Sequence, residues 1–410
     1  MQSRLERRLA CDCQYMDTHD PSLYIHIPFC QTKCSYCAFN TYTGMDVLID
    51  PYLAALAREI KQASAFLTDL GPAHTLYFGG GTPSLLTPAQ VKALIDLSRN
   101  RFDLIPEAEI SLECNPGDAD VDQFSALRAA GVNRISIGVQ SAHMADLVMF
   151  SRRHTFDDAR SAFNMARSAG FDNVNVDLIY GAPNQTLNQW SHTLDSVLSW
   201  KPDHVSLYSL SLEEGTTLTR QVREGVLSPP DSDIAADMYE LCREKLADKG
   251  FIHYEISNWA LPNRECRHNI QYWVNQPFLG FGAGAHGYTA GMRYWNVRPI
   301  PDYIERVTGK NITSQPQFPA LDDFDQIDLA GQMSDTVILG LRLLKEGVDS
   351  GDFETRYGVP LQTVYGNVID PLADTGFLTW RGRRLVLTPR AYLVSNQIFS
   401  RFIPDEHGVV

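Results

Sequence analysis

Residues 22–40 read SLYIHIPFCQTKCSYCAFN, an apolar run followed directly by three cysteines. The run SLYIHI is short and rich in β-branched and aromatic residues, which predicts a buried strand. Cys30, Cys34 and Cys37 follow at spacings of four and three residues, so that three thiolates can converge on one small metal site. Zinc usually takes four ligands, often as two CxxC pairs, and no second pair follows here. A 4Fe-4S cluster on three cysteines would leave one iron open to a substrate or cofactor.

The first predicted strand has five counterparts farther along the chain, separated from one another by amphipathic segments. This alternation is typical of βα units around a parallel sheet. Six units predict an α/β fold, a partial (β/α)6 barrel of the TIM type that stops short of the eight units needed for closure. The further strands are TLYF from Thr75, EISLE from Glu109, RISIG from Arg134, VNVDLI from Val174 and HVSLYSL from His204.

Local signals predict where several helices begin and end. Asp50 and Thr87 are each followed by proline, the pattern of an N-cap residue before the first helical position. Gly131 and Gly170 are expected to end two helices just before the next strand. A further helix is expected over residues 231–249, after which the stretch HNIQYWVNQPFLGFGAGAHGY predicts irregular packing against the barrel.

The rest of the chain predicts a smaller, mostly helical C-terminal domain that ends in a β-hairpin. Its helical part is DDFDQIDLAGQMSDTVILGLRLL, and GFLTWRGRRLVLT forms the hairpin around its RGR centre. The predicted organisation is a flexible tail, a core domain, a connecting aromatic and glycine-rich region, and the C-terminal domain, over residues 1–20, 21–255, 256–318 and 319–410.

Composition limits the classes of function. The chain has 410 residues and a formal charge of −14, which argues against a general nucleic-acid binder. No uncharged apolar run approaches the ~20 residues that cross a bilayer, and the first twenty residues do not resemble a secretory signal. We therefore expect a cytoplasmic protein, in which spaced cysteines more often indicate metal or redox chemistry than disulfides.

Polar residues recur where the predicted strands end. A glycine-rich turn, GGGTPS at residues 79–84, follows the second strand, and glycine lets a backbone approach a ligand closely. Glu113, Gln140 and Asp177 close or lie in the third, fourth and fifth strands, and Arg152 follows twelve residues after Gln140. Because the carboxyl ends of parallel strands meet at one edge, these side chains are expected to converge on one site. Arg153 and His154 leave the assignment of Arg152 open by one residue, and a solvated basic turn is the alternative there. For Asp177 the alternative is a satisfied structural carboxylate.

A CxxxCxxC motif after the first strand of a βα barrel, together with the glycine turn, resembles the radical S-adenosylmethionine superfamily. The resemblance implies that S-adenosylmethionine chelates the open iron and that an electron from the cluster cleaves its sulfonium to a 5′-deoxyadenosyl radical. Tyr36, between the last two cysteines, matches an aromatic position beside adenine. The residues that the resemblance assigns to S-adenosylmethionine are Tyr24, Tyr36, Gly80, Gly81, Thr82, Glu113, Gln140, Arg152 and Asp177.

Five segments in order, YIHIPFC, GGGTPS, NPG, GVNRISIGVQS and DLIYGAP, resemble the branch that contains the oxygen-independent coproporphyrinogen III oxidases and the haem chaperones. The resemblance covers residues 22 to about 395. The oxidases have a further cysteine two residues after the third, where this chain has Phe39. Residues 268–273, HNIQYW, fit the HNxxYW pattern of the chaperones, which implies haem b as cargo and His268 as its ligand. Cys266 and His286 are the other candidate axial ligands.

The first hypothesis is therefore a haem chaperone that carries a 4Fe-4S cluster and S-adenosylmethionine and lacks oxidase activity. It implies haem, haem-accepting proteins that include membrane-associated ones, an electron donor and a homodimer as partners, with peripheral membrane attachment as an option. The alternatives are a coproporphyrinogen III oxidase of porphyrin biosynthesis and a radical enzyme on an unrelated substrate; no catalytic residue is assigned. Cys114 and Cys242 are expected to fill core space, whereas Cys11 and Cys13 could be redox-active, bind metal or haem, or have no role.

Overall fold

The large sheet of the protein is built on the six predicted strands. The structure is a computed structural model that describes residues 20–68, 70–309 and 318–404. All six strands begin at the predicted residues and pair in parallel in chain order, which confirms the barrel units. They are β1 (Ser22–Ile27), β4 (Thr75–Gly80), β5 (Glu109–Cys114), β6 (Arg134–Gln140), β7 (Val174–Tyr180) and β8 (His204–Ser209).

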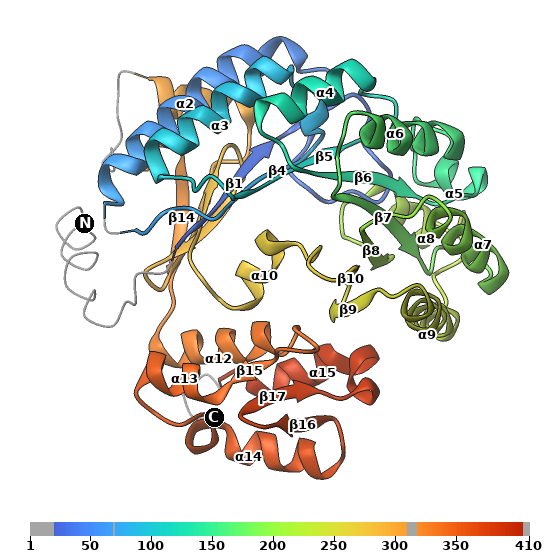
Figure 1. The fold of residues 1–410 in the computed structure, drawn as a ribbon, viewed down its shortest axis with the longest axis vertical. Helices are drawn as coiled ribbons and strands as arrows, with labels where there is room; N and C mark the ends of the chain where they lie inside the picture. The colour runs from blue at the N-terminus through green and yellow to red at the C-terminus, as the bar shows by residue number, and fades with distance from the viewer. Residues whose placement is uncertain (1–19, 69, 310–317, 405–410) are drawn as a thin grey trace.

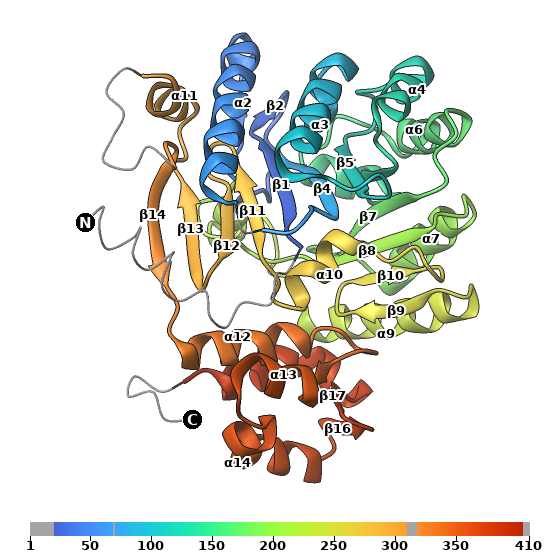
Figure 2. The same cartoon turned by 60° about the vertical axis from the view of Figure 1, so that its left-hand side comes forward.

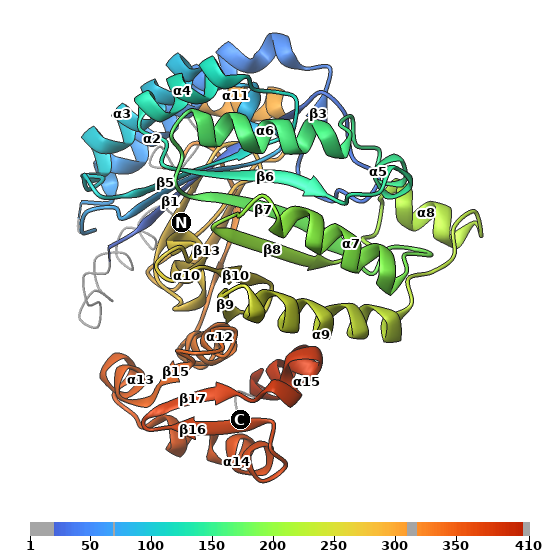
Figure 3. The same cartoon turned by 45° about the vertical axis from the view of Figure 1, so that its right-hand side comes forward.

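Helices cover the outer, convex face of this sheet, and the strands curve around the inner face (Figure 1). The strands are buried along nearly their whole length, because helices pack on one side and inward side chains fill the other. Figure 3 shows most of the helices side by side along the sheet and two short ones beyond the carboxyl ends of the strands. They are α2 (Ile49–Phe66), α3 (Pro88–Phe102), α4 (Val121–Ala130), α5 (Met144–Met149), α6 (Phe156–Ser168), α7 (Leu187–Leu198), α8 (Thr217–Arg223) and α9 (Ser232–Asp248).

Most of the predicted helix ends are confirmed. Thr87 caps α3, since its side chain accepts from the backbone N–H of Gln90 while the Gln90 side chain accepts from that of Thr87. Gly131 and Gly170 follow α4 and α6 with φ of +114° and +87°. The prediction that Asp50 caps α2 is wrong: a 3-10 turn, η2 (Asp46–Leu48), leads into α2 at Ile49, and the Asp50 carboxylate instead accepts from Gln90 Nε2 at 2.8 Å.

The prediction of irregular packing after residue 256 is also wrong. Short strands extend the sheet to twelve strands in the order β14-β13-β12-β11-β1-β4-β5-β6-β7-β8-β10-β9. β11 pairs in parallel with β1, and β10 pairs antiparallel with β8. Sequence periodicity misses these strands because they are short and interrupted by glycine, whereas the exposed edges of β1 and β8 favour pairing. The strands are β9 (Ile252–Glu255), β10 (Asn258–Ala260), β11 (Phe278–Phe281), β12 (His286–Thr289), β13 (Met292–Asn296) and β14 (Leu321–Gln326).

Two helices accompany the added strands. α10 (Arg267–Trp273) lies between β10 and β11, and α11 (Ile300–Thr308) packs beside α2 (Figure 2). β14, which falls inside the predicted C-terminal domain, is the last strand of the large sheet and not part of a helix. Its sequence, LDDFDQ, is largely exposed, so that no apolar face reveals it as a strand.

The C-terminal part packs below the barrel (Figures 1 and 2). The predicted hairpin is present, and β15 joins it in a three-stranded sheet of order β15-β17-β16. Helical turns follow the hairpin, so the described chain continues beyond it to Pro404. The elements are α12 (Leu329–Gly340), β15 (Val348–Asp349), α13 (Ser350–Tyr357), α14 (Leu361–Asp374), β16 (Leu378–Arg381), β17 (Arg384–Leu387), η4 (Pro389–Val394), α15 (Ser395–Phe399) and η5 (Ser400–Phe402).

Parts of two predictions fall outside the description. Cys11, Cys13 and the predicted tail up to residue 19 lie outside the described residues.

Among the described residues, no helix has both the length and the apolar character needed to span a membrane.

Removal of the Thr87 cap tests the local origin of α3. Thr87→Ala is expected to lower the free energy of unfolding by about 1 kcal/mol, because the N–H of Gln90 loses its acceptor. Denaturant titration measures the change. Thr87→Ser keeps the hydroxyl and should remain within a few tenths of a kcal/mol of wild type; an equal loss in both variants would contradict the assignment.

Candidate functional site

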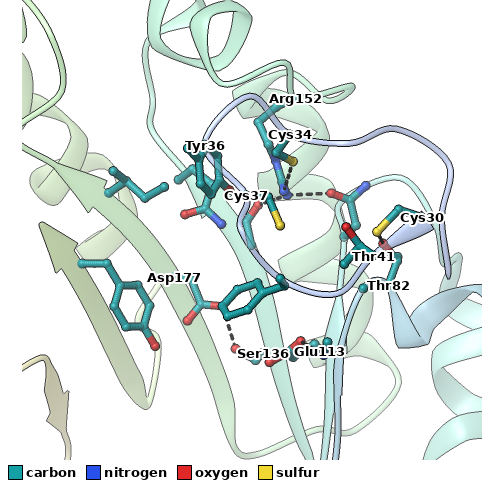
Figure 4. A pocket seen from close by; sticks show the side chains of 18 of the residues that line it. Cys30, Cys34, Tyr36, Cys37, Thr41, Thr82, Glu113, Ser136, Arg152 and Asp177 are labelled. Carbon is teal, nitrogen blue, oxygen red and sulfur yellow. Dashed lines mark hydrogen bonds between the residues drawn. The ribbon is translucent and has the colours of Figure 1, made fainter. Parts of the chain in front are cut away.

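A cavity of about 670 Å³ opens at the carboxyl ends of the parallel strands. Figure 4 shows the loop that carries the cysteines on one side and the carboxylates of the strands on the other. The convergence predicted from strand order is therefore present. Eleven of the predicted site residues line this cavity: Cys30, Cys34, Tyr36, Cys37, Gly80, Gly81, Thr82, Glu113, Gln140, Arg152 and Asp177. Tyr24 and His268 do not.

The cysteine loop, residues 30–41, is closed at its base by a two-stranded parallel pair. β2 (Phe29–Cys30) pairs with β3 (Tyr42–Thr43), so both arms of the loop leave the same point. The Thr82 hydroxyl donates to Cys30 Sγ at 3.4 Å, and Arg152 Nη1 donates to Cys34 Sγ at 3.5 Å. Donors of this kind favour thiolate sulfur.

All three cysteines are free, half-buried thiols. Burial raises the pKa of the Cys30 and Cys37 thiols. In the part of the chain that the structure describes, no three histidine, cysteine or acidic side chains lie close enough together to hold a metal ion. The cysteines thus share one cavity without converging on one point, and their joint ligation of a cluster stays a prediction.

The glycine turn, residues 79–81, packs against the base of the cysteine loop. The N–H of Gly81 donates to the Ile27 carbonyl at 2.8 Å, and a Cβ on Gly81 would lie 2.6 Å from the Phe29 carbonyl oxygen. Gly80 has φ of +110°, and a Cβ there would lie 2.4 Å from the His26 ring. Only glycine fits at either position, which keeps the backbone of the turn open to the cavity.

Two carboxylates face the cavity from neighbouring parts of the sheet. Glu113 accepts from the Tyr77 hydroxyl at 3.0 Å and from the N–H of Gly80 at 3.1 Å. Asp177 accepts from Ser136 Oγ at 2.8 Å, and burial raises its pKa. Burial and the nearby Asp177 charge raise the pKa of Glu113 to about 7. The site therefore holds a carboxyl group that changes charge near neutral pH.

Arg152 is placed between the cysteine loop and the strands. Its Nη2 donates to Asn115 Oδ1 at 2.6 Å and to the Gly138 carbonyl at 2.7 Å. Arg153 instead pairs with Asp118 at 2.7 Å. Of these two arginines, only Arg152 donates to a cysteine, and its predicted role in binding S-adenosylmethionine stays a prediction.

Three further side chains that the sequence singles out are His154, Gln140 and Tyr36. His154 is buried, with Nε2 against the Val139 carbonyl, so it does not substitute for Arg152. Gln140 has φ of +67°, and its buried Oε1 has no hydrogen-bond partner among the described residues. An uncommon backbone conformation and an orphaned acceptor in the cavity wall fit a ligand that donates to Gln140. The Tyr36 ring lines the same cavity and packs edge-on against Phe150, with 5.2 Å between ring centroids.

The two predicted residues that do not line the cavity lie beneath it. The Tyr24 hydroxyl bonds His26 Nδ1 at 3.0 Å, and the Tyr24 ring packs against Gly79. His268 is 1% exposed, with Nδ1 2.7 Å from Thr75 Oγ1 and Nε2 2.8 Å from the Tyr272 hydroxyl. Both ring nitrogens are thus engaged in this conformation. Their roles in binding S-adenosylmethionine and haem stay predictions.

Burial and the charge of Arg134 lower the pKa of His268 to about 3, so its ring is neutral. The other candidate haem ligands differ in access. Cys266 is buried and its Sγ lies 3.5 Å from Glu109 Oε1, whereas His286 is exposed on β12 beside Trp295. Asn269, the second residue of the HNIQYW segment, reaches the cavity itself.

Sequence reasoning missed most of the polar floor of the cavity. The missed residues occupy alternate positions of buried strands, so they share the inward face with the predicted ones. Ser136 lies two residues after Arg134, and Asn175 lies two residues before Asp177. A search for polar residues at every second position of an apolar strand would have found them. They are Arg134, Ser136, Asn175, Ser206 and Tyr208.

Comparisons with known proteins agree with this class of fold and site. The model of the Radical SAM superfamily matches residues 24–197, and that of the HemN C-terminal domain matches residues 327–394. The structure of coproporphyrinogen III oxidase (HemN) from Escherichia coli, described as a radical SAM enzyme, superimposes with a TM-score of 0.82. The two chains are 24% identical, and the superposition covers 98% of this chain and 93% of the oxidase chain, which shows a shared fold.

Whole-chain relatives identify the family more narrowly. The heme chaperone HemW of Mycobacterium tuberculosis (strain ATCC 25618 / H37Rv) is 39% identical over 383 residues, which are 92% of this chain and 93% of the relative. That of Bacillus subtilis (strain 168) is 37% identical over 387 residues, 94% and 99% of the two chains. The chain therefore belongs to the HemW family of the radical SAM superfamily.

The raised pKa of Glu113 predicts a pH dependence of stability. Between its ordinary value of 4.5 and about 7, the folded state keeps a proton that the unfolded state has lost. Stability is therefore lost as the pH rises through this window, by roughly 1 kcal/mol per pH unit. In denaturant titrations from pH 4.5 to 8, Glu113→Gln should remove this contribution and make the loss less steep, whereas the contribution of Glu59, whose pKa burial also raises to about 7, should remain. Glu107→Gln, at an exposed glutamate, should keep the full loss; the same slope in wild type and Glu113→Gln would refute the assignment.

Proposed function

We propose that this chain binds haem and delivers it to acceptor haemoproteins. The observation that carries the proposal is the identity of 35–39% to proteins named heme chaperone HemW over more than nine tenths of this chain. Chains this similar over more than nine tenths of their length share their fold. Haem delivery itself is a function of those relatives, by their names, and is proposed here by family membership.

The alternative function, oxidative decarboxylation of coproporphyrinogen III, is less favoured. The likeness to the oxidase structure is one of fold, at 24% identity. At the position where the oxidases are expected to carry a further cysteine, Phe39 lines the cavity with 69% of its surface exposed. An exposed phenylalanine supplies apolar contact area and no ligand for iron.

The cavity also fits the cofactors that the superfamily implies. Cys30, Cys34 and Cys37 would hold a 4Fe-4S cluster, which, when bound, supplies an electron to the sulfonium of S-adenosylmethionine. Three free thiols on one loop, all lining one cavity, are the donor set for such a cluster. Arg152 Nη1 donates to Cys34 Sγ, so a positively charged side chain lies beside this set of donors.

The strand residues would bind the organic cofactor. Gln140 Oε1 is an acceptor without a partner, and the carboxylates of Glu113 and Asp177 can accept from hydroxyl groups such as those of a ribose. The glycine turn leaves room for a ligand to approach its backbone. Each of these residues binds or orients; none is assigned a proton transfer.

Haem is proposed to bind through the HNIQYW segment on α10. Asn269 brings this segment to the cavity. Tyr272 packs against His268 and Trp273 lies under Arg342, so these rings would supply flat apolar surface for a macrocycle only after α10 rearranges. Ligation by His268 would require its ring to leave Thr75 and Tyr272, at the loss of two hydrogen bonds. The cytoplasmic location, membrane-associated acceptors, the electron donor and the homodimer belong to the same proposal.

Cysteine replacement tests the cluster. Cys30→Ala, Cys34→Ala or Cys37→Ala should each abolish a stable 4Fe-4S cluster after anaerobic reconstitution, because two thiolates rarely hold it. Iron and sulfide content and the 400 nm region of the absorption spectrum measure the loss. Cys242→Ala is the matched control and should retain the cluster, because Cys242 is a buried cysteine whose sulfur accepts a hydrogen bond from Trp190. Wild-type iron content in any of the three variants would refute the ligand set.

Haem titration tests the ligand. If His268 ligates haem, His268→Ala should abolish the shifted haem spectrum, while His286→Ala should leave it unchanged. Thr75→Val removes a hydrogen bond to His268 but keeps the ring, and should strengthen rather than weaken haem binding, because it removes one of the two hydrogen bonds that hold the ring in its buried position. An unchanged haem spectrum in His268→Ala would refute ligation by this residue.

One parallel experiment decides between the two functions. A single anaerobically reconstituted sample with a reductant is divided between a haem-binding titration and an assay for conversion of coproporphyrinogen III. Haem binding without conversion supports the chaperone. Conversion above the rate of the cysteine variants would overturn the chaperone as the sole function.

A further inference from the structure

The Asn40 side chain joins the end of the cysteine loop to a segment far away in the sequence, and the Tyr42 hydroxyl adds a second link at 3.1 Å from the Arg298 carbonyl. Asn40 Nδ2 donates to the carbonyl of Ala283 and to that of Arg298, each at 3.0 Å. These partners lie 243 and 258 residues farther along the chain. Asn40 Oδ1 accepts from the Tyr42 hydroxyl at 2.9 Å. Both donors and the acceptor of the amide are therefore used.

The backbone of the same residue is held from the other side. The Asn40 carbonyl lies 2.9 Å from His26 Nε2, and His26 Nδ1 faces the Tyr24 hydroxyl. Because a carbonyl only accepts, Nε2 must carry the proton, and Nδ1 then accepts from Tyr24. Asn40 is thus anchored to β1 through its backbone and to the β11–β13 region through its side chain.

The receiving segment is shaped to accept Asn40. In the β11–β12 loop, residues 282–285, Gly284 has φ of +72°, and a Cβ on it would lie 2.5 Å from Asn40 Nδ2. Glycine is therefore needed at this position both for backbone conformation and for the close approach of the amide. Any larger residue would push Asn40 away from the Ala283 carbonyl.

The β11–β12 loop is itself rigidly supported. The N–H of Gly282 donates to Glu59 Oε2 at 2.9 Å, and the N–H of Ala283 donates to the Tyr52 hydroxyl at 3.0 Å. The Tyr52 hydroxyl in turn donates to the His26 carbonyl at 2.7 Å. These supports come from α2 and β1, and all are buried. Asn40 therefore binds a fixed receptor.

We propose that Asn40 is a positioning residue that locks the cysteine loop to the β11–β12 loop, so that the two segments become ordered together. The HNIQYW segment lies on α10, and β11 follows α10 along the chain. The hydrogen bond of Asn40 to Ala283, just after β11, therefore connects the cysteine loop to the HNIQYW segment through β11. Order at either segment then favours order at the other, by the reciprocity of coupled equilibria. The inference rests on the proposed function only in treating residues 30–41 as a cluster-binding loop.

Hydrogen exchange of the cluster-free protein tests the lock independently of any cofactor. Asn40→Ala should speed exchange roughly tenfold, because two or more hydrogen bonds are lost, at amides of both residues 30–43 and residues 282–298. Thr43→Ala, at an exposed residue on the same arm of the loop, is the control and should leave both segments unchanged. Faster exchange confined to residues 30–43 would overturn the coupling.

Gly284→Ala approaches the lock from the distant side. It should speed exchange in the cysteine loop although it lies outside the cavity, and this effect should be absent in the Asn40→Ala background, where no side-chain amide remains to be displaced. Additive effects of the two substitutions on residues 30–43 would contradict the proposal. If Asn40→Ala folds poorly, Gly284→Ala alone still tests the proposal, because it should speed hydrogen exchange in the cysteine loop.

The reconstituted protein supplies the second readout. Iron release to a chelator should be roughly tenfold faster in Asn40→Ala than in wild type and Thr43→Ala. Equal release rates would overturn the positioning role. If wild type takes up no cluster, the proposed function fails, and the exchange experiment alone still decides the lock.

Discussion

Parallel pairing of β1 with β4 on one side and β11 on the other is the interaction on which the rest of the structure depends. β1 ends in the cysteine loop, β4 ends in the glycine turn, and β11 ends in the loop that receives Asn40. Since parallel strands end at the same edge of a sheet, their pairing brings three distant segments together. The hydrogen bonds from Gly81 to Ile27 and from Asn40 to Ala283 join these ends.

A second constraint on the fold is that the inner face of the barrel carries polar and ionisable side chains, which need hydrogen-bond partners. Glu113, Asp177 and Arg134 face inward and place ionisable groups in the wall of the cavity. Hydroxyl and amide donors such as Tyr77 and Ser136 compensate the carboxylates. Gln140 Oε1, in contrast, is buried without a hydrogen-bond donor among the described residues. A buried acceptor without a partner costs stability, and a ligand that donates to it would remove this cost.

The HNIQYW segment shows how one motif can serve both structure and function. α10 begins where Glu109 accepts from the N–H groups of Arg267 and His268, and His268 then bonds Thr75 of β4. These contacts place α10 under the barrel and bring Asn269 to the cavity. The segment for which haem binding is proposed thus also contributes to the packing of the barrel, and ligation by His268 would break its hydrogen bonds to Thr75 and Tyr272.

The sequence by itself determined the six barrel strands, the capping of α3, the α9 helix and the C-terminal hairpin, because each is encoded by local periodicity and turn residues. It also determined that the cysteine loop, the glycine turn and the polar residues at the strand ends share one cavity, since such residues converge in any parallel barrel, but it missed the polar residues inside the strands. Only the tertiary structure decided that Arg152 rather than Arg153 reaches Cys34, that residues 278–296 extend the sheet, and that His268 is buried. Those outcomes depend on which edges and cavities remain to be filled after the barrel forms, and no local pattern carries that information.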